Sequence, residues 1–458
     1  MDLENVRQYL AKHHDRFVQE LCEYLRFPSI SAQPDHRRDV EACAQWLRAH
    51  CQKIGLEAQI FPTPGSPIVV AKTPGKSPPG QPRFLVYGHY DVQPVDPLDL
   101  WKTEPFQPQV RNGALYARGA ADNKGQHMAH LNALEAYLKT GTPLPCPLTF
   151  ICEGEEEVGS ANLAHFLQTH RAELACDAVV ISDTGMPSRK HPALTYALRG
   201  IAALEVKLTG AARDLHSGIY GGSLDNPAMA LCQLLAQLRD KKGRVAVPGF
   251  YDDVEELTAF ERRQLSRLPY SEGAYRRFAG VPRLFGEQGF TPWEQRTARP
   301  TLEINGLTSG YQGAGSKTII PAWASAKLTL RLVPRQKPRT VLNLVQRHLK
   351  TLCPPTMKLA METGHSGDPY VVSPTGELAQ AALRALKTAF ECEPVLMREG
   401  GSIPIVNDFK RILKADTLLL GLSLPDDNPH SPNEKFDLEI FRRGMLLSAM
   451  LWPELARG

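Results

Sequence analysis

Residues 84–89, with the sequence FLVYGH, have the composition of a buried strand that ends in a polar side chain. Four consecutive apolar residues without alternation are typical of a strand that is covered on both faces of its sheet. The runs LTFI (148–151), AVVI (178–181) and TLLL (417–420) repeat this composition. A helical pattern follows Lys124, with apolar residues on one side, and Gly141 is its expected stop. Buried strands that alternate with helices indicate an α/β fold.

The middle of the chain has a different pattern. Apolar and charged residues alternate over 204–208 (LEVKL) and 326–332 (AKLTLRL), which is typical of strands with one exposed face. Helical patterns begin near Pro227 and Pro338, and proline is favoured in the first turn of a helix. We therefore predict a two-layer α+β unit here, in which helices cover one face of a sheet.

The chain has 458 residues, which is longer than one hydrophobic core normally serves. The buried type of pattern returns towards the C-terminus, where residues 377–390 predict a helix. We therefore predict a discontinuous first domain, residues 1–198 and 366–458, in which helices flank a mixed sheet. The α+β unit, residues 199–365, is predicted to be inserted into it.

Composition and charge exclude several classes of protein. The formal net charge is only +4 and no long basic run occurs, so we expect no nucleic-acid partner. No stretch of 18 apolar residues is present and the N-terminal region lacks a signal peptide, so we expect no membrane partner. The nine cysteines are scattered without a CxxC pair, which argues against a disulfide framework or a thiolate zinc site. These features together predict a cytoplasmic protein.

Candidate metal ligands follow the buried strands. His89 ends the first of these strands, the adjacent Glu156 and Glu157 follow the second, and Asp183 follows the third. Asp122 lies in the intervening loop. Each residue alone has an ordinary explanation as a turn or a solvated acidic loop. Because the carboxyl ends of strands in an open α/β sheet meet at one edge, their joint occurrence favours a site for two adjacent divalent cations.

Three motifs carry a resemblance to a known family: GHYDVQP (88–94), RGAADNKG (118–125) and EGEEEVGS (153–160). They resemble the M20 family of co-catalytic metallopeptidases, and most of all its cytosolic nonspecific dipeptidase (carnosinase-like) branch. The segments DLHSG (214–218) and GGSIP (400–404) are similar to that branch as well. The resemblance implies that the first domain is catalytic, that the inserted domain is a lid/dimerisation domain, and that the protein is a homodimer.

The resemblance also implies a set of metal ligands for two divalent cations per subunit, zinc or manganese. One cation is expected to be held by His89, Asp122 and Asp183, and the other by Asp122, Glu157 and His430. His430 belongs to the segment PHSPNE (429–434), which looks like the last ligand motif of the family. The peptide bond between Asp122 and Asn123 matches a family position where the bond is cis.

Two further residues are expected to serve the metal centre. Asp91 resembles the carboxylate that holds the His89 ring and sets its tautomer. Glu156 resembles the general base, since a carboxylate that is not bound to metal can take a proton from water and pass it to the leaving amine. Glu155 and Glu156 are an alternative pair of residues for the ligand and the base.

Substrate contacts are expected from the inserted domain and from the GGSIP segment. His216 resembles the family histidine that reaches the active site of the neighbouring subunit and polarises the scissile carbonyl, although by itself it could be a loop histidine. Arg331 suits capture of a terminal carboxylate, or is an exposed strand arginine. Thr318, Ser402 and Gly401 are expected to share the Arg331 pocket, where the Gly401 turn could present backbone N–H groups or be an ordinary loop.

The function expected from this set is metal-dependent hydrolysis of the amide bond of dipeptides or similar short peptides. An alternative is the same chemistry on N-acyl, N-succinyl or N-carbamoyl amino acids, which needs the same metal ligands. A third alternative is a metal-stabilised binding protein without turnover. Such a protein would be expected to lack Glu156 or a ligand, and the sequence contains all of them.

Overall fold

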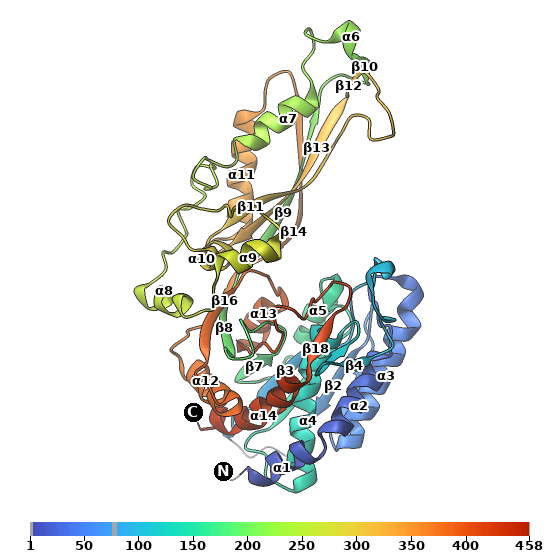
Figure 1. The fold of residues 1–458 in the computed structure, drawn as a ribbon, viewed down its shortest axis with the longest axis vertical. Helices are drawn as coiled ribbons and strands as arrows, with labels where there is room; N and C mark the ends of the chain where they lie inside the picture. The colour runs from blue at the N-terminus through green and yellow to red at the C-terminus, as the bar shows by residue number, and fades with distance from the viewer. Residues whose placement is uncertain (1–2, 76–79, 458) are drawn as a thin grey trace.

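The computed structural model describes residues 3–75 and 80–457, so the terminal residues of the predicted first domain, 1–2 and 458, lie outside it. The chain forms two parts, one around a large sheet that carries both termini and one around a smaller sheet (Figure 1). Among the described residues, no helix combines the length and the apolar character needed to cross a bilayer. All nine cysteines are free thiols.

The large sheet has nine strands in the order β1-β2-β6-β3-β7-β17-β8-β15, and β16 pairs with β8. The centre is parallel, since β3 runs parallel to β6 and β7, whereas β2 is antiparallel to both β1 and β6. The predicted mixed sheet is therefore confirmed. Its strands are β1 (Glu57–Phe61), β2 (Ile68–Lys72), β3 (Phe84–His89), β6 (Leu148–Glu153), β7 (Ala178–Ile181), β8 (Ala193–Leu198), β15 (Tyr370–Val371), β16 (Val395–Glu399) and β17 (Asp416–Leu419).

Helices cover both faces of this sheet. Successive residues of each strand point to opposite faces, so each apolar strand contributes side chains to the packing on both sides. In β3, Phe84 and Val86 join one hydrophobic core, and Leu85 and Tyr87 join another. The first core lies under α1 (Glu4–Lys12), α2 (His14–Leu25), α3 (Arg37–Ile54), α4 (Gly125–Thr140), α12 (Glu377–Phe390) and α14 (Leu438–Leu455). The second lies under α5 (Leu163–Thr169), α13 (Ile405–Asp408) and the π-helical turn η5 (Phe409–Leu413).

The smaller sheet is antiparallel and four-stranded, in the order β11 (Thr301–Ser309), β13 (Trp323–Leu332), β9 (Gly200–Thr209) and β14 (Lys358–Gly367). Inward residues of β9 and β13, such as Val206 and Leu328, share a core with Val345. That core lies under α7 (Pro227–Ala236) and α11 (Pro338–Leu352), so the predicted two-layer unit is confirmed. The Asn226 side chain caps α7 by accepting a hydrogen bond from the Ala228 N–H.

Three short helices lie between the two sheets: α8 (Ala259–Ser266), α9 (Glu272–Ala279) and α10 (Pro292–Thr297) (Figure 1). Leu265 and Leu268 pack with Ala193 of β8 and Met397 of β16, so this stretch of the inserted segment is anchored on the large sheet. The domain boundaries at residues 198/199 and 365/366 stay predictions, and β14 continues to Gly367.

Two small sheets complete the fold. The pair β10 (Leu215–His216) and β12 (Ile319–Ile320) lies with α6 (Ser217–Tyr220) at the end of the second part that is far from the large sheet (Figure 1). The set β18 (Lys435–Asp437), β5 (Ala114–Tyr116) and β4 (Gln109–Arg111) packs beside the loop that carries Asp122, in the first part.

Candidate metal centre

The candidate ligands meet at the carboxyl edge of the parallel strands. His89 is the last residue of β3 and pairs with Glu153, the last residue of β6. Asp183 lies two residues beyond the end of β7. Asp122 comes from the turn η3 (Ala120–Lys124), directly before α4. The connection from strand to helix therefore delivers each side chain to the same edge of the sheet.

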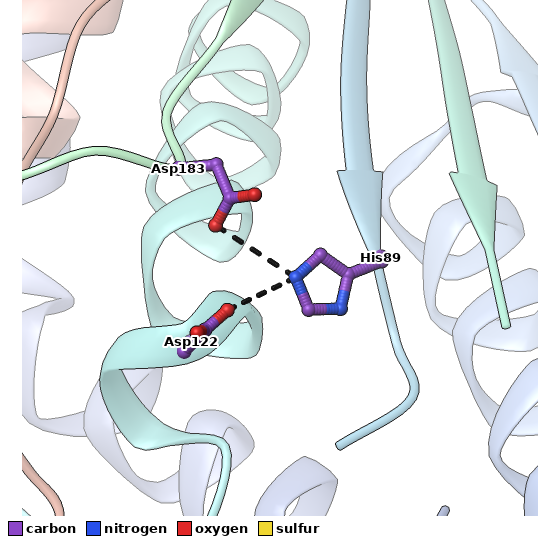
Figure 2. Close-up of side chains that lie close together, drawn as sticks. All are labelled: His89, Asp122 and Asp183. Carbon is purple, nitrogen blue, oxygen red and sulfur yellow. Dashed lines mark hydrogen bonds and ion pairs between the residues drawn. The ribbon is translucent and has the colours of Figure 1, made fainter. Parts of the chain in front are cut away.

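The first group of ligand atoms surrounds the Nε2 atom of His89. This atom lies 3.0 Å from Oδ1 of Asp122 and 3.7 Å from Oδ1 of Asp183. Figure 2 shows both carboxylates directed at the same ring nitrogen from two other segments of the chain. His89 is fully buried. One donor atom from each of the three residues lies within 4.8 Å of the others, a spacing at which they could hold one ion.

The second group uses the other oxygen of Asp122. The Nε2 atom of His430 lies 2.9 Å from Oδ2 of Asp122 and 3.3 Å from Oε2 of Glu157. These three residues also offer donor atoms within 4.8 Å of one another. Asp122 therefore directs one oxygen to each group, which is the arrangement that a carboxylate bridging two cations requires.

Asp91 ties the two halves of the centre together. Its carboxylate accepts the backbone N–H groups of Glu156 and Glu157 at 3.2 and 3.1 Å, and the hydroxyl of Ser31 at 2.6 Å. The Nδ1 atom of His89 lies 3.1 Å from the Asp91 carbonyl oxygen and 3.4 Å from its Oδ1. The Asp91 backbone carbonyl therefore lies closer to the ring than the expected carboxylate does, and the carboxylate contacts both the ring and the glutamate turn.

The structure brings Glu157 to the ligand group and directs Glu155 elsewhere. The Glu155 carboxylate accepts hydrogen bonds from the Ser66 N–H and the Asn162 side chain, both at 2.8 Å. Glu157 Oε2 accepts from the Gln93 amide at 2.7 Å, while its Oε1 is buried without a partner among the described residues. This geometry favours Glu156–Glu157 over the alternative pair Glu155–Glu156.

Several supporting residues were not identified from the sequence. The side-chain amide of Asn123 donates to Oδ1 of Asp183 at 2.7 Å, and the bond between Asp122 and Asn123 is cis, as the resemblance implied. Glu434 accepts the backbone N–H groups of Gly119, Ala121 and Asp122 at 2.9 to 3.1 Å. The only available signal was position in the sequence: Asn123 follows the candidate ligand Asp122, and Glu434 lies four residues after the candidate ligand His430.

The close approach of these side chains shifts their pKa values. Hydrogen bonds to Asp122 and Glu157 raise the pKa of His430 to about 10. Burial opposes the charged form of His89, but hydrogen bonds to Asp122 and Asp183 outweigh burial and hold its pKa well above 6.5. Burial also raises the pKa of Glu156 well above its usual value, and the charges of Asp183 and Glu157 add to this effect. Without cations, the two histidines therefore carry protons between the carboxylates.

The donor set fits two divalent cations. Imidazole nitrogen and carboxylate oxygen are ligands that zinc and manganese accept. The unpartnered Oε1 of buried Glu157 is a polar atom without compensation, and a bound cation would satisfy it. The raised pKa values of His89 and His430 mean that a cation would have to displace a proton from each ring, as expected for ligands that must be deprotonated to bind.

The expected carboxylate-binding residues lie beside this centre. Arg331 Nη1 donates to Oγ of Ser402 at 3.0 Å, across the junction of the two parts. Ser402 and Gly401 line a cavity of about 770 Å³ that also contains Asp122 and Asp183. The Arg331 pocket and the metal centre are therefore adjacent in one chain.

His216 and Thr318 are not part of this neighbourhood. They lie together, since the Ser217 N–H donates to the Thr318 carbonyl at 3.0 Å and His216 is paired with Ile319. Their small sheet is at the far tip of the second part (Figure 1). Most of strand β13 lies between this tip and Arg331, since the eight residue steps from Trp323 to Arg331 span roughly 26 Å. Within one chain Thr318 therefore lies away from the Arg331 pocket, because Thr318 precedes β13 and Arg331 is near the end of that strand, so a shared role in substrate binding stays a prediction.

Comparison with known proteins places the chain in a family. Residues 85–452 match the family described as Peptidase family M20/M25/M40. The Cys-Gly metallodipeptidase dug1 of Schizosaccharomyces pombe is 32% identical over 100% of this chain and 99% of its own length. The Beta-Ala-His dipeptidase of Homo sapiens is 33% identical, with 99% of this chain and 93% of that protein covered.

Solved structures agree with these sequence matches. Human carnosine dipeptidase 1 superposes with a TM-score of 0.86 at 32% identity, covering 100% of this chain and 99% of that one. The dipeptidase Dug1p from Saccharomyces cerevisiae gives a TM-score of 0.85 at 30% identity, with the same coverage. The expected family is confirmed: the chain belongs to the M20 family of metallopeptidases.

Proposed function

We propose that this enzyme hydrolyses the amide bond of dipeptides and similarly short peptides, using two divalent cations, zinc or manganese, per subunit. The observation that carries the proposal is the pair of ligand groups that share Asp122. The substrates named for the relatives, Cys-Gly and β-Ala-His, are both dipeptides, which favours this function over hydrolysis of N-acyl, N-succinyl or N-carbamoyl amino acids.

The proposed ligands follow the geometry of the two groups. His89 and Asp183 would hold one cation, Glu157 and His430 would hold the other, and Asp122 would offer one carboxylate oxygen to each. When bound, the cations supply polarisation of the scissile carbonyl and a lower pKa for an attacking water. The chain keeps the ligands in place through Asp91 and Asn123, which hold His89 and Asp183 respectively.

Glu156 is the proposed proton carrier. Its carboxylate takes a proton from the attacking water and delivers it to the nitrogen of the leaving amine, so the proton count is balanced over the reaction. Two features support the assignment. The Asp91 carboxylate fixes the Glu156 backbone N–H at 3.2 Å, and burial raises the Glu156 pKa towards the range that a proton carrier needs.

Arg331 is the proposed anchor for the terminal carboxylate of the substrate. No ion pair among the described residues includes Arg331, so its guanidinium is available to an anion. The Ser402 hydroxyl orients it, and the neighbouring turn at Gly401 offers backbone N–H groups to the same carboxylate. An anchor at a fixed distance from the metals would select short substrates.

His216 is proposed to act in the active site of a partner subunit, within a homodimer. The Gly218 N–H donates to Nδ1 of His216 at 3.0 Å, so the neutral ring carries its proton on Nε2. That Nε2–H is suited to donate to the developing oxyanion of the substrate. Thr318 lies beside His216 and would reach the same partner site. We also propose a cytoplasmic location, since nine free thiols suit a reducing compartment.

The test of the activity is a panel of dipeptides and N-acyl amino acids assayed after reconstitution with Zn²⁺ or Mn²⁺. We expect dipeptides to be cleaved faster by orders of magnitude, and Glu156→Gln to abolish turnover. Glu155→Gln is the matched control, because Glu155 is a neighbouring carboxylate directed away from the centre. Preferential cleavage of acyl amino acids would reject the dipeptidase proposal, and full activity of Glu156→Gln would reject the proposed proton carrier.

The dimer proposal has a separate test by subunit mixing. His216→Ala and Glu156→Gln are each expected to form inactive homodimers. In a mixed dimer, the Glu156→Gln subunit supplies an intact His216 to the intact metal centre of the other subunit, so one competent site is restored. Gel filtration that shows only an active monomer, or mixtures that stay inactive after confirmed subunit exchange, would contradict the proposal.

A further inference from the structure

The cavity beside the metal centre extends well beyond the proposed ligands. Its volume of about 770 Å³ reaches from Asp122 and Asp183 to the helices α9 and α10 at the junction of the two parts. The wall on that side is aromatic and consists of Tyr270, Tyr275, Phe278 and Trp293, which we call the aromatic wall. Neither catalysis nor carboxylate binding, as proposed above, uses these four side chains.

The aromatic wall has an anchored base and an open face. Trp293 packs against the cluster of Leu265 and Met397, and Arg296 stacks over the Trp293 ring with its Cζ 3.7 Å from the ring centroid. By contrast, no residue of α9 is buried, and Phe278 is 81% exposed. Aromatic surface left open next to a reaction centre is typical of a binding site rather than of a core.

A second cavity shows which end of the substrate the aromatic wall faces. This cavity, of about 480 Å³, contains Arg331, the proposed carboxylate anchor. It shares Tyr275, Pro292 and Arg296 with the first cavity, so the aromatic wall, through Tyr275, borders both the cavity of the metal centre and the cavity of Arg331. In a dipeptide held by its carboxylate, the residue between these two points is the carboxy-terminal one.

We propose that the aromatic wall binds the side chain of the carboxy-terminal residue of the substrate and selects a bulky apolar side chain over glycine. This inference rests on the proposed function and specifies its substrate class. The physical basis is burial of apolar side-chain surface against Tyr275 and Phe278, which favours phenylalanine or leucine at that position. The alternative is that this site prefers an acidic side chain at the carboxy-terminal position, attracted by the guanidinium of Arg296.

The first test is a comparison of kcat/KM for Gly-Gly, Gly-Phe, Phe-Gly and Gly-Asp with the metal-reconstituted enzyme. We expect Gly-Phe to exceed Gly-Gly by about tenfold or more, since a few buried carbon atoms in a pocket are worth 10- to 200-fold. Preference for Gly-Asp, or enhancement only for Phe-Gly, would overturn the inference while leaving dipeptide hydrolysis intact. If none of the four dipeptides is cleaved, it is the proposed function that fails.

The second test uses variants of the open face. Phe278→Ala and Tyr275→Ala are expected to lower kcat/KM for Gly-Phe about fivefold or more, mainly through KM, and to leave Gly-Gly unchanged. Tyr275→Phe should restore the preference, because it keeps the ring. Val110→Ala is the control, since Val110 is an exposed apolar residue that lines neither cavity. Equal loss for Gly-Gly and Gly-Phe would show a general structural effect and would overturn the inference.

Discussion

Replacement of Asp91 by asparagine tests how the metal centre is held together. The buried carboxylate accepts three hydrogen bonds, from the Glu156 N–H to Oδ1 and from the Glu157 N–H and Ser31 hydroxyl to Oδ2. Asparagine keeps one acceptor and turns the other into a donor. The least costly orientation retains the oxygen at Oδ2, where two donors meet, and sets the new NH₂ group against the Glu156 N–H.

The expected magnitude follows from these contacts. Leaving a buried donor such as the Glu156 N–H without its acceptor costs about 1–3 kcal/mol. Loss of the negative charge beside His89 would also weaken the hold on a proposed metal ligand, and changes of this kind cost about 10- to 100-fold in metal affinity. We therefore expect Asp91→Asn to weaken zinc binding within that range. At saturating zinc, kcat should still fall, because the displaced turn carries Glu156.

The assay is competition for zinc with a fluorescent chelator, followed by kcat measurements in excess zinc. Ser31→Ala is the matched control, because it removes one neutral donor and leaves the Asp91 carboxylate in place. We expect its effect on zinc affinity to be several times smaller. Asp91→Asn with unchanged zinc affinity and unchanged kcat would refute the reasoning that this carboxylate organises both the ring and the glutamate turn.

Three further predictions concern pH and charge. Burial raises the pKa of Glu153 to about 7, so ionisation of this carboxyl should lower the free energy of unfolding as pH rises from 4.5 through 7. In metal-free protein, Glu153→Gln should be more stable than wild type by roughly 3 kcal/mol above pH 7 and equal to it in acid, as measured by urea unfolding, because its Oε1 still accepts from the Tyr87 and Ser160 hydroxyls. Because cations must displace protons from His89 and His430, whose pKa values are raised, zinc affinity should increase with pH between 6 and 9; a flat titration would contradict this. Arg331→Lys should raise KM for dipeptides by about 10- to 100-fold with a smaller effect on kcat, because an ammonium cannot replace a bidentate guanidinium; an unchanged KM would exclude Arg331 as the anchor.

The fold was predictable where burial alone decides the pattern. The strands β3, β6, β7 and β17 are runs of apolar residues because both faces of the sheet are covered. The helix α4 was expected to have apolar residues on one side. Every residue from Gly125 to Tyr137 is buried instead, because α4 lies between the sheet and the helices α1 and α14. Small residues such as Ala129 and Ala133 permit this close packing, and a periodicity argument does not detect them.

The candidate site was predictable only in part from physical reasoning. His89, Asp183 and the glutamate pair follow strands of a parallel sheet, whose geometry brings them together. His430 has no such signal, since it lies in a loop 308 residues from Asp122, and only the family resemblance pointed to it. The supporting residues Ser31 and Gln93 come from loops whose course no local pattern predicts.

The spacing of His216 along the sequence does not say which metal centre it could reach, but the geometry of the fold does. The second part joins the first near Arg199, where the Ser402 hydroxyl contacts both the Arg199 carbonyl and the Arg331 guanidinium. Rotation about this junction preserves the distance of the tip from it, which is about the 26 Å that β13 spans from Trp323 to Arg331. The metal centre, however, shares a cavity with Ser402 and so lies next to the junction. We therefore expect a rigid closing motion to leave His216 away from the metal centre of its own chain, so the catalytic role proposed for this residue would need the centre of another subunit.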